Sequence, residues 1–222
     1  MRAVIFANGV LDSGDETRQA IRTEDLLIAA DGGAENCLKL GFVPNVVIGD
    51  MDSLPDELQT DLISQRVEFF PYPSDKDQTD LELALTFAIH QGSTEIVLIG
   101  LLGGRLDQTL ANLLLLAREE WGSARLVIFA GRDTGYVLRG ATKILFSGDI
   151  GDLVSLIPLT PDVKDVSTRG LKWTLSSATL TFGSSLGISN ELTDSKAEIQ
   201  IRSGTLLLVH RRINASQVQG GV

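Results

Sequence analysis

Carboxylates gather in the loops of the first half of the chain, where apolar segments end. Asp31 follows one apolar segment, and Asp50 and Asp52 follow the next. A two-residue spacing in an extended chain places both side chains on the same side. Like charges this close repel, so the group either has raised pKa values or holds a cation. The acidic residues of these loops are Asp31, Asp50, Asp52, Asp75, Asp77, Asp80 and Asp107.

The ligand atoms in these loops indicate which cation they would hold. They are carboxylate oxygens, and no cluster of histidine or cysteine accompanies them. Oxygen ligands on loops are typical of Mg²⁺ rather than zinc. A single Asp in a loop is also a common turn-former or helix cap. The Asp50–Asp52 pair is therefore the stronger signal.

A glycine-rich loop over residues 100–107 has the composition of a phosphate-binding segment. Gly103 and Gly104 precede Arg105, so backbone N–H groups and a guanidinium would both reach phosphate oxygens. No G-K-[ST] sequence follows and no G-x-G-x-x-G motif is present, which excludes the two common nucleotide loops. The alternative interpretation is a plain connection between a strand and a helix.

A second motif has a hydrolase-like pattern in the wrong context. Residues 183–187 match G-x-S-x-G, and Asp194 and His210 follow in the order of a hydrolase triad. That motif needs a strand, a sharp turn and a helix, whereas Ser185 lies in a strand-rich region and polar residues follow it. We therefore predict no nucleophile at Ser185.

The elements that carry the acidic loops have the pattern of an α/β protein. Continuous apolar runs of about five residues indicate strands buried on both faces, hence a parallel sheet covered by helices. In such a sheet, ligands bind beyond the carboxyl ends of the strands, where the loops meet. The predicted strands are residues 3–7, 26–30, 46–48, 95–99 and 126–130.

Helix-start signals lie between these strands. Thr79 and Glu82 form a capping box, and Ser53 with Asp56 makes a similar start, with Pro55 near the first turn. Residues 109–119 predict a helix that is apolar on nearly all sides, which we expect to be sandwiched between other elements. Alternation of strands and helices predicts the α/β class.

The helical pattern disappears after Gly131. Short strand-like segments follow, and Ser203-Gly204 is predicted to be a hairpin turn between the last two. We predict an N-terminal parallel-sheet α/β domain of Rossmann-like type over residues 1–135. A small C-terminal all-β sandwich over 140–215 and a flexible tail over 216–222 complete the prediction. The strand-like segments are residues 154–157, 179–182, 198–202 and 205–210.

Composition excludes several classes of protein. The chain has 222 residues, of which 29 are acidic and 19 basic, and a net charge of −10 opposes tight binding to nucleic acid or an anionic membrane. No apolar run approaches the ~20 residues that span a bilayer. The single cysteine, Cys37, cannot form an internal disulfide, and the start lacks a signal-peptide pattern. We expect a cytoplasmic protein with Cys37 in its core.

Six segments, taken in order, identify a resemblance. No one of them is decisive, but their succession is specific and covers nearly the whole chain, which resembles the thiamine pyrophosphokinase family. That resemblance implies an α/β domain, a β-sandwich and a homodimer. It also implies transfer of the pyrophosphoryl group of ATP to the hydroxyl of thiamine, giving thiamine diphosphate and AMP. The segments are DGGA (31–34), GDMDS (49–53), DKDQTD (75–80), GGRLD (103–107), GLKWTL (170–175) and GISNE (187–191).

By this resemblance, particular residues would serve the phosphates and the metal. Asp50, Asp52 and Asp80 would hold Mg²⁺. Arg105 and Lys76 would contact the phosphates of ATP. Asp107 would either orient Arg105 or accept the hydroxyl proton, and the two roles stay open. The nucleotide crevice would be lined by Asn8, Asp31, Gly32, Gly33, Gly103, Gly104 and Asn112.

Thiamine is a flat cation, which suits an aromatic face backed by negative charge. Trp173 is the candidate for that face, and a buried core tryptophan is the alternative interpretation. Ser189 and Asn190 would hydrogen-bond the aminopyrimidine, on a sandwich surface that the resemblance places over the active site of the other subunit. Two positions depart from the family pattern: Gly187 stands where some relatives have a hydroxyl residue, and Gln108 where many have His.

Two other functions remain open from the sequence. One is a related nucleotide-dependent phosphotransferase acting on another alcohol. The other is a module that binds thiamine or a nucleotide without turnover. The intact set of Asp50, Asp52, Asp80 and Arg105 argues against the module, because a pure binder needs no metal clamp.

Overall fold

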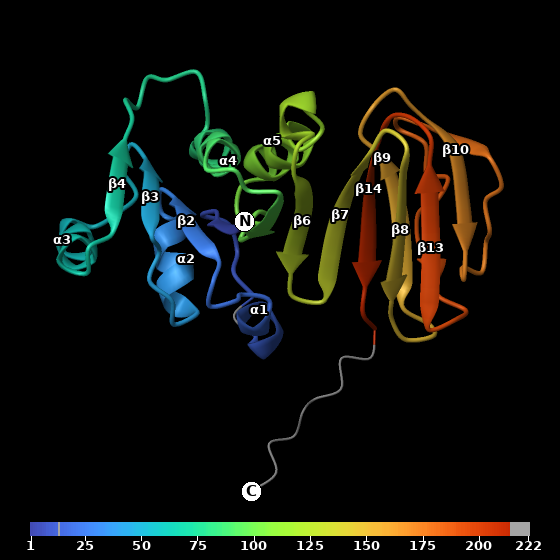
Figure 1. The fold of residues 1–222 in the computed structure, drawn as a ribbon, viewed down its shortest axis with the longest axis horizontal. Coiled ribbons are helices and arrows are strands. Elements are labelled where there is room, and N and C mark those ends of the chain that lie inside the picture. The colour runs from blue at the N-terminus through green and yellow to red at the C-terminus, as the bar shows by residue number, and fades with distance from the viewer. Residues whose placement is uncertain (13, 214–222) are drawn as a thin grey trace, which may run out of the picture. The chain divides into compact units, whose positions relative to one another are not determined.

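The computed structural model describes residues 1–12 and 14–213, so the tail expected at 216–222 lies outside the described residues. The chain divides into two compact units, one formed by Met1–Gly131 and the other beginning at Arg132. Figure 1 shows helices and strands alternating in the first unit and strands dominating the second. No helix of the described ranges is long and apolar enough to cross a membrane.

The first unit contains six parallel strands in the order β6-β5-β1-β2-β3-β4. The strands β1, β2, β3 and β5 have no exposed residue, as their unbroken apolar sequences predict. The pattern did not reveal β4, which is a largely exposed edge strand. The strands are β1 (Arg2–Phe6), β2 (Leu26–Ala30), β3 (Val46–Gly49), β4 (Glu68–Pro71), β5 (Glu95–Ile99) and β6 (Arg125–Ala130).

Strand β1 lies at the point where the strand order reverses, because its neighbours are β2 on one side and β5 on the other. The loops after β1 and β5 lie against each other there, joined by backbone hydrogen bonds of 2.8 Å from Gly9 to Gly100 and from Val10 to Leu102. In open parallel sheets, ligands bind beside such a reversal of strand order. Helices α2 and α4 both pack on β1 and β2, and Glu82 of α4 pairs with Arg118, which lies just beyond the end of α5. The helices are α1 (Asp15–Gln19), α2 (Gly33–Lys39), α3 (Asp56–Ser64), α4 (Asp80–His90) and α5 (Leu106–Leu115), with a 3₁₀ turn at Glu119–Trp121.

The helix expected at 109–119 differs from the structure. Helix α5 ends at Leu115, and none of its ten described residues is buried. Leu106, Leu110 and Leu114 are exposed, spaced four residues apart on one face. The expectation of a sandwiched helix is wrong, because apolar composition does not by itself supply a neighbouring element to cover each face.

Helices begin at both predicted starts, but only one of them has the predicted side-chain cap. The hydroxyl of Thr79 accepts a hydrogen bond from the backbone N–H of Glu82 at 3.3 Å, as a capping box requires. At α3, Pro55 is the N-cap and no side chain caps the helix. The hydroxyl of Ser53 instead donates to the carboxylate of Asp52 at 3.1 Å.

The second unit consists of two antiparallel groups of strands. Their orders are β12-β9-β14-β7 and β11-β10-β13-β8. Leu156 and Leu208 from the first group share one buried cluster with Val163 and Ile199 from the second. The strands are β7 (Asp133–Arg139), β8 (Thr142–Ser147), β9 (Leu153–Pro158), β10 (Asp162–Arg169), β11 (Ala178–Thr181), β12 (Asn190–Glu191), β13 (Lys196–Ile201) and β14 (Thr205–Arg211).

The hairpin expected at Ser203-Gly204 is wrong. Strand β13 pairs with β8 and β10, whereas β14 pairs with β7 and β9, so the two consecutive strands belong to different groups. Gly204 has φ +90°, and a Cβ there would lie 2.4 Å from the carbonyl oxygen of Asp162. Gly204 lies in the connection that takes the chain from one group of strands to the other, and such a connection has the same local sequence pattern as a hairpin turn.

Candidate active site

Three carboxylates of the first unit converge at the carboxyl ends of β2 and β3. One oxygen from each of Asp31, Asp50 and Asp80 lies within 4.8 Å of the others. Asp31 follows β2, Asp50 follows β3 and Asp80 begins α4. Of the predicted metal set, the structure brings Asp50 and Asp80 together and adds Asp31, while Asp52 stays exposed outside this cluster.

Gly49 allows this convergence. It has φ +151°, and a Cβ on it would lie 2.9 Å from Cβ of Asp31 and 3.0 Å from Cγ of Asp80. The first distance is shorter than real Cβ contacts and the second is at their limit, so another residue here would require the side chains of Asp31 and Asp80 to shift. The last residue of β3 therefore determines how closely the acidic cluster packs.

Lys76 lies among these carboxylates. Its Nζ is 3.3 Å from Oδ2 of Asp50 and 3.0 Å from Oδ1 of Asp80. Burial raises the pKa of Asp80, and this outweighs the opposing effect of Lys76. Burial also acts to raise the pKa of Asp50, but the backbone N–H of Asp52 and the Lys76 ammonium outweigh it and lower that pKa. The pKa values of these two neighbouring carboxyls are thus shifted in opposite directions.

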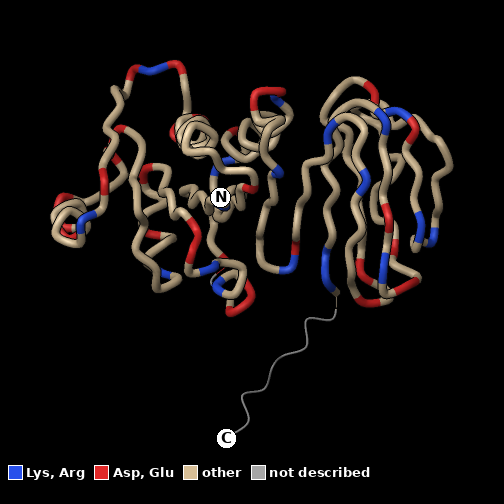
Figure 2. The backbone as a smooth tube through the Cα atoms, viewed as in Figure 1, with Lys and Arg blue, Asp and Glu red and all other residues tan. Residues whose placement is uncertain are grey.

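The cluster fits a divalent cation that binds oxygen ligands. Among residues 1–12 and 14–213, no hydrogen-bond partner reaches the buried Oδ1 of Asp31. A buried carboxylate oxygen without a donor is costly unless a cation or ordered water serves it. Carboxylates from three separate elements, without His or Cys, are the donor set that Mg²⁺ prefers. Figure 2 shows how often acidic residues, in red, recur on the loops of this unit.

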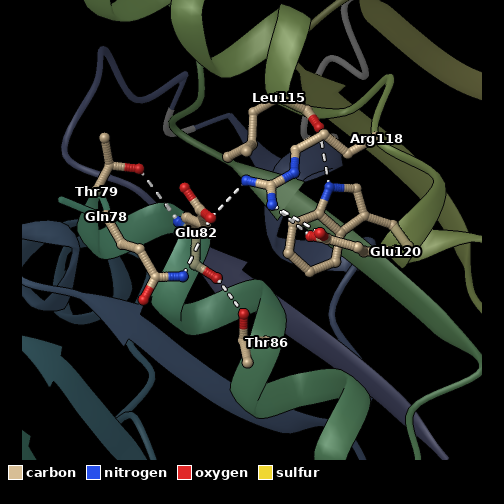
Figure 3. A network of polar contacts seen from close by, with 8 residues as sticks. Gln78, Thr79, Glu82, Thr86, Leu115, Arg118 and Glu120 are labelled. Carbon is tan, nitrogen blue, oxygen red and sulfur yellow. Dashed lines mark hydrogen bonds and ion pairs between the residues drawn. The ribbon is translucent and has the colours of Figure 1, made fainter.

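A polar network holds the start of α4, and hence Asp80, in place (Figure 3). Glu82 accepts hydrogen bonds from Arg118 at 2.5 Å and from Nε2 of Gln78 at 3.1 Å. Arg118 also contacts Glu120 at 2.8 Å. Since Arg118 lies just beyond α5, this network joins the two helices that border the acidic cluster.

A cavity of about 480 Å³ extends from the acidic cluster to the glycine-rich loop. The predicted residues Asp50, Asp52 and Asp80 line it together with Arg105. Sequence reasoning did not assign Ser53, Thr79 or Leu101 to this cavity, because their types carry no ligand signal. The other predicted residues that line it are Asn8, Asp31, Gly103, Gly104, Gln108 and Asn112.

Arg105 and Asp107 form an exposed ion pair at this cavity. Nε of Arg105 donates to Oδ1 of Asp107 at 3.1 Å, and a terminal nitrogen reaches Oδ2 at 2.5 Å. The bond from Arg105 lowers the pKa of Asp107. The contact is the one expected if Asp107 orients the guanidinium.

Two glycines let the loops after β1 and β2 lie against each other. A Cβ on Gly33 would lie 1.9 Å from the carbonyl oxygen of Phe6, and one on Gly32 would lie 2.4 Å from Nδ2 of Asn8.

Asn112 joins α5 to the loop after β5, since its Nδ2 donates to the carbonyl of Leu101 at 3.1 Å. These residues shape the cavity through backbone packing.

The second unit has its own cavity, of about 520 Å³, lined by Trp173, Gly187 and Asn190. Trp173 is 57% exposed, so the interpretation as a core tryptophan is wrong. Asn190 is buried and holds the Trp173 backbone, accepting from its N–H at 3.0 Å and donating to its carbonyl at 2.7 Å. Ser189 is exposed with φ +56°, and its N–H donates to Oγ of Ser155 at 3.0 Å.

The backbone conformation explains why a glycine stands at position 187, where some relatives have a hydroxyl residue. Gly187 has φ +97°, and a Cβ on it would lie 3.1 Å from both Cβ and the carbonyl oxygen of Leu156.

The structure does not have the strand, turn and helix that the hydrolase-like motif requires, since Ser185 lies in the loop between β11 and β12. His210 is buried and contacts Asp152 at 2.8 Å rather than forming a triad.

Together these features define a parallel α/β unit with an acidic, cation-fitting crevice at its strand ends, followed by a β unit that presents an exposed tryptophan beside a cavity. The family model described as "Thiamin pyrophosphokinase, catalytic domain" matches residues 17–130. The model described as "Thiamin pyrophosphokinase, vitamin B1 binding domain" matches residues 142–206. The chain belongs to the thiamin pyrophosphokinase family.

Individual relatives agree with this assignment. The chain is 28% identical to the thiamine pyrophosphokinase of Bacillus subtilis (strain 168) over 184 residues, covering 83% of this chain and 86% of that protein. It is 26% identical to thiamine pyrophosphokinase 1 of Oryza sativa subsp. japonica, covering 84% and 79%.

Solved structures show the same likeness. The crystal structure of the B. subtilis enzyme has a TM-score of 0.84 at 27% identity, covering 96% of this chain and all of that one. The crystal structure of thiamin pyrophosphokinase from Geobacillus thermodenitrificans has a TM-score of 0.80 at 28% identity, covering 97% and 99%.

Proposed function

We propose that this protein transfers the pyrophosphoryl group of ATP to the hydroxyl of thiamine, giving thiamine diphosphate and AMP. The observation that carries the proposal is the convergence of Asp31, Asp50 and Asp80 beside Arg105 in one cavity. The chain that contains it belongs to a family defined by this activity. In the reaction the thiamine hydroxyl oxygen bonds to the β-phosphorus, and the bond from that phosphorus to the oxygen retained by AMP breaks.

The metal of this reaction is proposed to be Mg²⁺, held by Asp50 and Asp80 with Asp31 and Asp52 beside them. Bound there, the ion supplies positive charge that offsets the phosphate oxygens. The buried, unpartnered oxygen of Asp31 supports this placement. Asp52 contacts the cluster through its backbone, whose N–H donates to Oδ1 of Asp50 at 3.3 Å, while its carboxylate accepts from the hydroxyl of Ser53 at 3.1 Å.

The cationic side chains of the crevice are proposed to bind the phosphates. Lys76 is already held between two carboxylates, and Arg105 is oriented by Asp107. A guanidinium held in a fixed plane matches phosphate oxygens at two points. Such contacts stabilise charge that develops on the leaving group during transfer. In this arrangement Asp107 acts as a positioning residue for Arg105.

Thiamine is proposed to bind at the cavity of the second unit. Nζ of Lys172 lies 5.0 Å from the centre of the Trp173 ring and 2.9 Å from Oε2 of Glu191. The cationic ring of thiamine would stack on the opposite face of the Trp173 indole from Lys172. Asn190 would fix the tryptophan, and Ser189 would hydrogen-bond the aminopyrimidine.

Three further features belong to the proposal. The first unit is of Rossmann-like type, which the reversal of strand order at β1 supports. The protein is a homodimer in which the sandwich of one protomer closes over the crevice of its partner. Its location is cytoplasmic, which a single, buried cysteine supports.

The test is product analysis. The protein is incubated with ATP, Mg²⁺ and thiamine, and the nucleotides are separated by chromatography. Equal amounts of AMP and thiamine diphosphate are expected. ADP as the sole nucleotide product would refute pyrophosphoryl transfer. Turnover of ATP only with a different alcohol would favour the related phosphotransferase, and binding without turnover would favour the module.

A further inference from the structure

The loop that carries Asp50 and Asp52 has a strained residue between them. Met51 has φ +65°, in the left-handed region that residues other than glycine rarely adopt. Such a conformation persists only where the surrounding structure holds it. The side chain of Met51 packs against the buried cluster that contains Val47 and Leu62. That packing anchors the side chain, but it does not fix the orientation of the peptide group that follows Met51.

Gln59 on α3 binds this peptide group. Its Nε2 donates to the carbonyl oxygen of Met51 at 3.3 Å and to that of Leu54 at 2.9 Å. The N–H of Leu54 also donates to the Met51 carbonyl at 3.3 Å, and the side chain of Leu54 is buried in the same apolar cluster. The amide of Gln59 therefore joins the strained point of the loop to a point that is anchored in the core.

The Met51 carbonyl belongs to the same peptide group as the N–H of Asp52. That N–H donates to Oδ1 of Asp50 at 3.3 Å. A trans peptide group is planar, so its C=O and N–H point in opposite directions and can only rotate together. The hydrogen bond from Gln59 at one end of this peptide therefore fixes the hydrogen bond to Asp50 at the other end. If the peptide turned over, a carbonyl oxygen would face the carboxylate and repel it.

Gln59 lies behind the acidic crevice. It is half-buried and, in the part of the chain that the structure describes, it does not line the cavity of about 480 Å³. Its helix is fixed to the sheet, because Leu62 of α3 is fully buried in one cluster with Val47 of β3. Gln59 can therefore act on a bound ion only through the loop.

We propose that Gln59 is a positioning residue for the metal site, an inference that rests on the proposed function. It holds the Met51–Asp52 peptide in the orientation that directs the Asp50 carboxylate toward the cation. Groups that orient the ligands of a metal typically change its affinity by about 10- to 100-fold when they are removed. The sequence gives no sign of this role, because a glutamine on a helix carries no ligand signal.

The test removes the hydrogen-bond donor and keeps the size of the side chain. Gln59→Leu lacks the amide, and Gln59→Glu replaces its nitrogen with an oxygen that cannot donate when ionised. Titration calorimetry with MgCl₂ should show about tenfold weaker binding for both variants. Gln59→Glu is the sharper of the two, because its added negative charge would by itself attract the cation. Mg²⁺ binding of wild-type strength in either variant would overturn the inference.

Two controls on the same helix separate positioning from stability. Gln65→Leu removes a glutamine amide that donates to Asp61 at 2.9 Å, at the far end of α3. Leu58→Ala weakens the packing of α3 against the buried cluster. Both should bind Mg²⁺ as the wild type does, although Leu58→Ala should have a lower thermal midpoint. An equal loss of Mg²⁺ affinity in Leu58→Ala and Gln59→Leu would refute the positioning role.

Amide hydrogen exchange, followed by NMR without metal, tests the contact itself. The N–H of Asp52 should exchange about tenfold faster in Gln59→Leu than in the wild type, because the peptide is no longer held. The N–H of Leu62, in the last turns of α3, should keep its wild-type rate.

Assays of thiamine diphosphate formation distinguish the two levels of the argument. If the wild type makes thiamine diphosphate but Gln59→Leu keeps the wild-type Mg²⁺ affinity and Asp52 exchange rate, the positioning role is refuted and the function stands. If Mg²⁺ binding and Asp52 exchange change as expected but the wild type makes no thiamine diphosphate, the function is refuted and the positioning role stands.

Discussion

Nζ of Lys76 lies 3.0 Å from Oδ1 of Asp80, and the same nitrogen lies 3.3 Å from Oδ2 of Asp50. A lysine ammonium therefore occupies the oxygens that are proposed to bind Mg²⁺. Lysine and metal compete for the same negative charge, and the lysine must share it or turn toward the phosphates when the substrates bind. This competition sets an expectation for each residue of the cluster.

Lys76→Met should bind Mg²⁺ alone several-fold more tightly and ATP more weakly. The carboxylates lose their internal counter-ion, and the phosphates lose a positive contact. Titration calorimetry with MgCl₂ and then with a non-hydrolysable ATP analogue measures both changes. Lys39→Met, which breaks an exposed pair with Glu35 on α2, is the control. Unaltered Mg²⁺ affinity in Lys76→Met would place the metal elsewhere.

Gly49→Ala should raise the Mg²⁺ concentration required for half-maximal activity by about tenfold or more. The added Cβ would lie within 3.0 Å of atoms of Asp31 and Asp80 and force them apart. Gly92→Ala is the matched control, since Gly92 also has positive φ but open space around it. If both variants respond alike, backbone strain rather than the cluster explains the effect.

Asp80→Asn and Asp52→Asn should each lose turnover on the order of 10²- to 10³-fold while the fold survives. Asp80 belongs to the converged cluster, whereas Asp52 lies in an exposed loop next to it. Steady-state rates over a range of Mg²⁺ concentrations, with circular dichroism for the fold, provide the measurement. Asp61→Asn on the surface of α3 should behave as the wild type. Full activity of Asp52→Asn at saturating Mg²⁺ would remove Asp52 from the metal site.

Trp173→Ala should weaken thiamine binding by about tenfold or more and change ATP affinity little. The substitution removes an aromatic face from a cationic ligand, an interaction of about 0.5–2 kcal/mol in addition to the lost apolar contact. Phe182→Ala is a close control, since Phe182 is also 57% exposed in the same unit. Separate KM measurements for the two substrates distinguish the cases. A larger effect on ATP would make Trp173 a structural residue.

The acid stability of the second unit should depend on Asp152. Burial acts to raise the pKa of Asp152, but hydrogen bonds from Ile213, His210 and Asp149 outweigh it and lower that pKa. The carboxylate therefore stabilises the fold above the ordinary aspartate pKa of about 3.9, and this stabilisation is lost as pH falls through the lower native value.

Asp152→Asn should lower the free energy of unfolding at neutral pH by about 1–3 kcal/mol. It should also flatten the decline of the thermal midpoint between about pH 5 and pH 2. Calorimetric scans across that range test both effects. Asp149→Asn changes an exposed carboxylate nearby and should retain the wild-type slope. An equally steep decline in Asp152→Asn would assign the acid sensitivity to other groups.

Much of the fold could be predicted because a strand that is buried on both faces must be apolar along its whole length. Runs such as residues 26–30 and 95–99 are apolar without interruption, and both are buried parallel strands. The edge strand Glu68–Pro71 has no such pattern, because only one neighbouring strand and part of one face need to be covered. For helix α5 the error was the opposite one: its apolar sequence predicted burial, but its leucines are exposed.

For the candidate site too, local features could be predicted from the sequence, whereas contacts between distant residues could not. Local spacing and hydrophobic period were enough to predict the acidic residues at the strand ends, the Thr79 cap and the division into two units. Three contacts became visible only in the folded chain: Asp31 joins Asp50 and Asp80, Lys76 contacts both Asp50 and Asp80, and Asn190 holds the backbone of Trp173. These contacts join residues distant in the sequence, and their geometry depends on strand order and on close approaches such as that at Gly49, which no local pattern records.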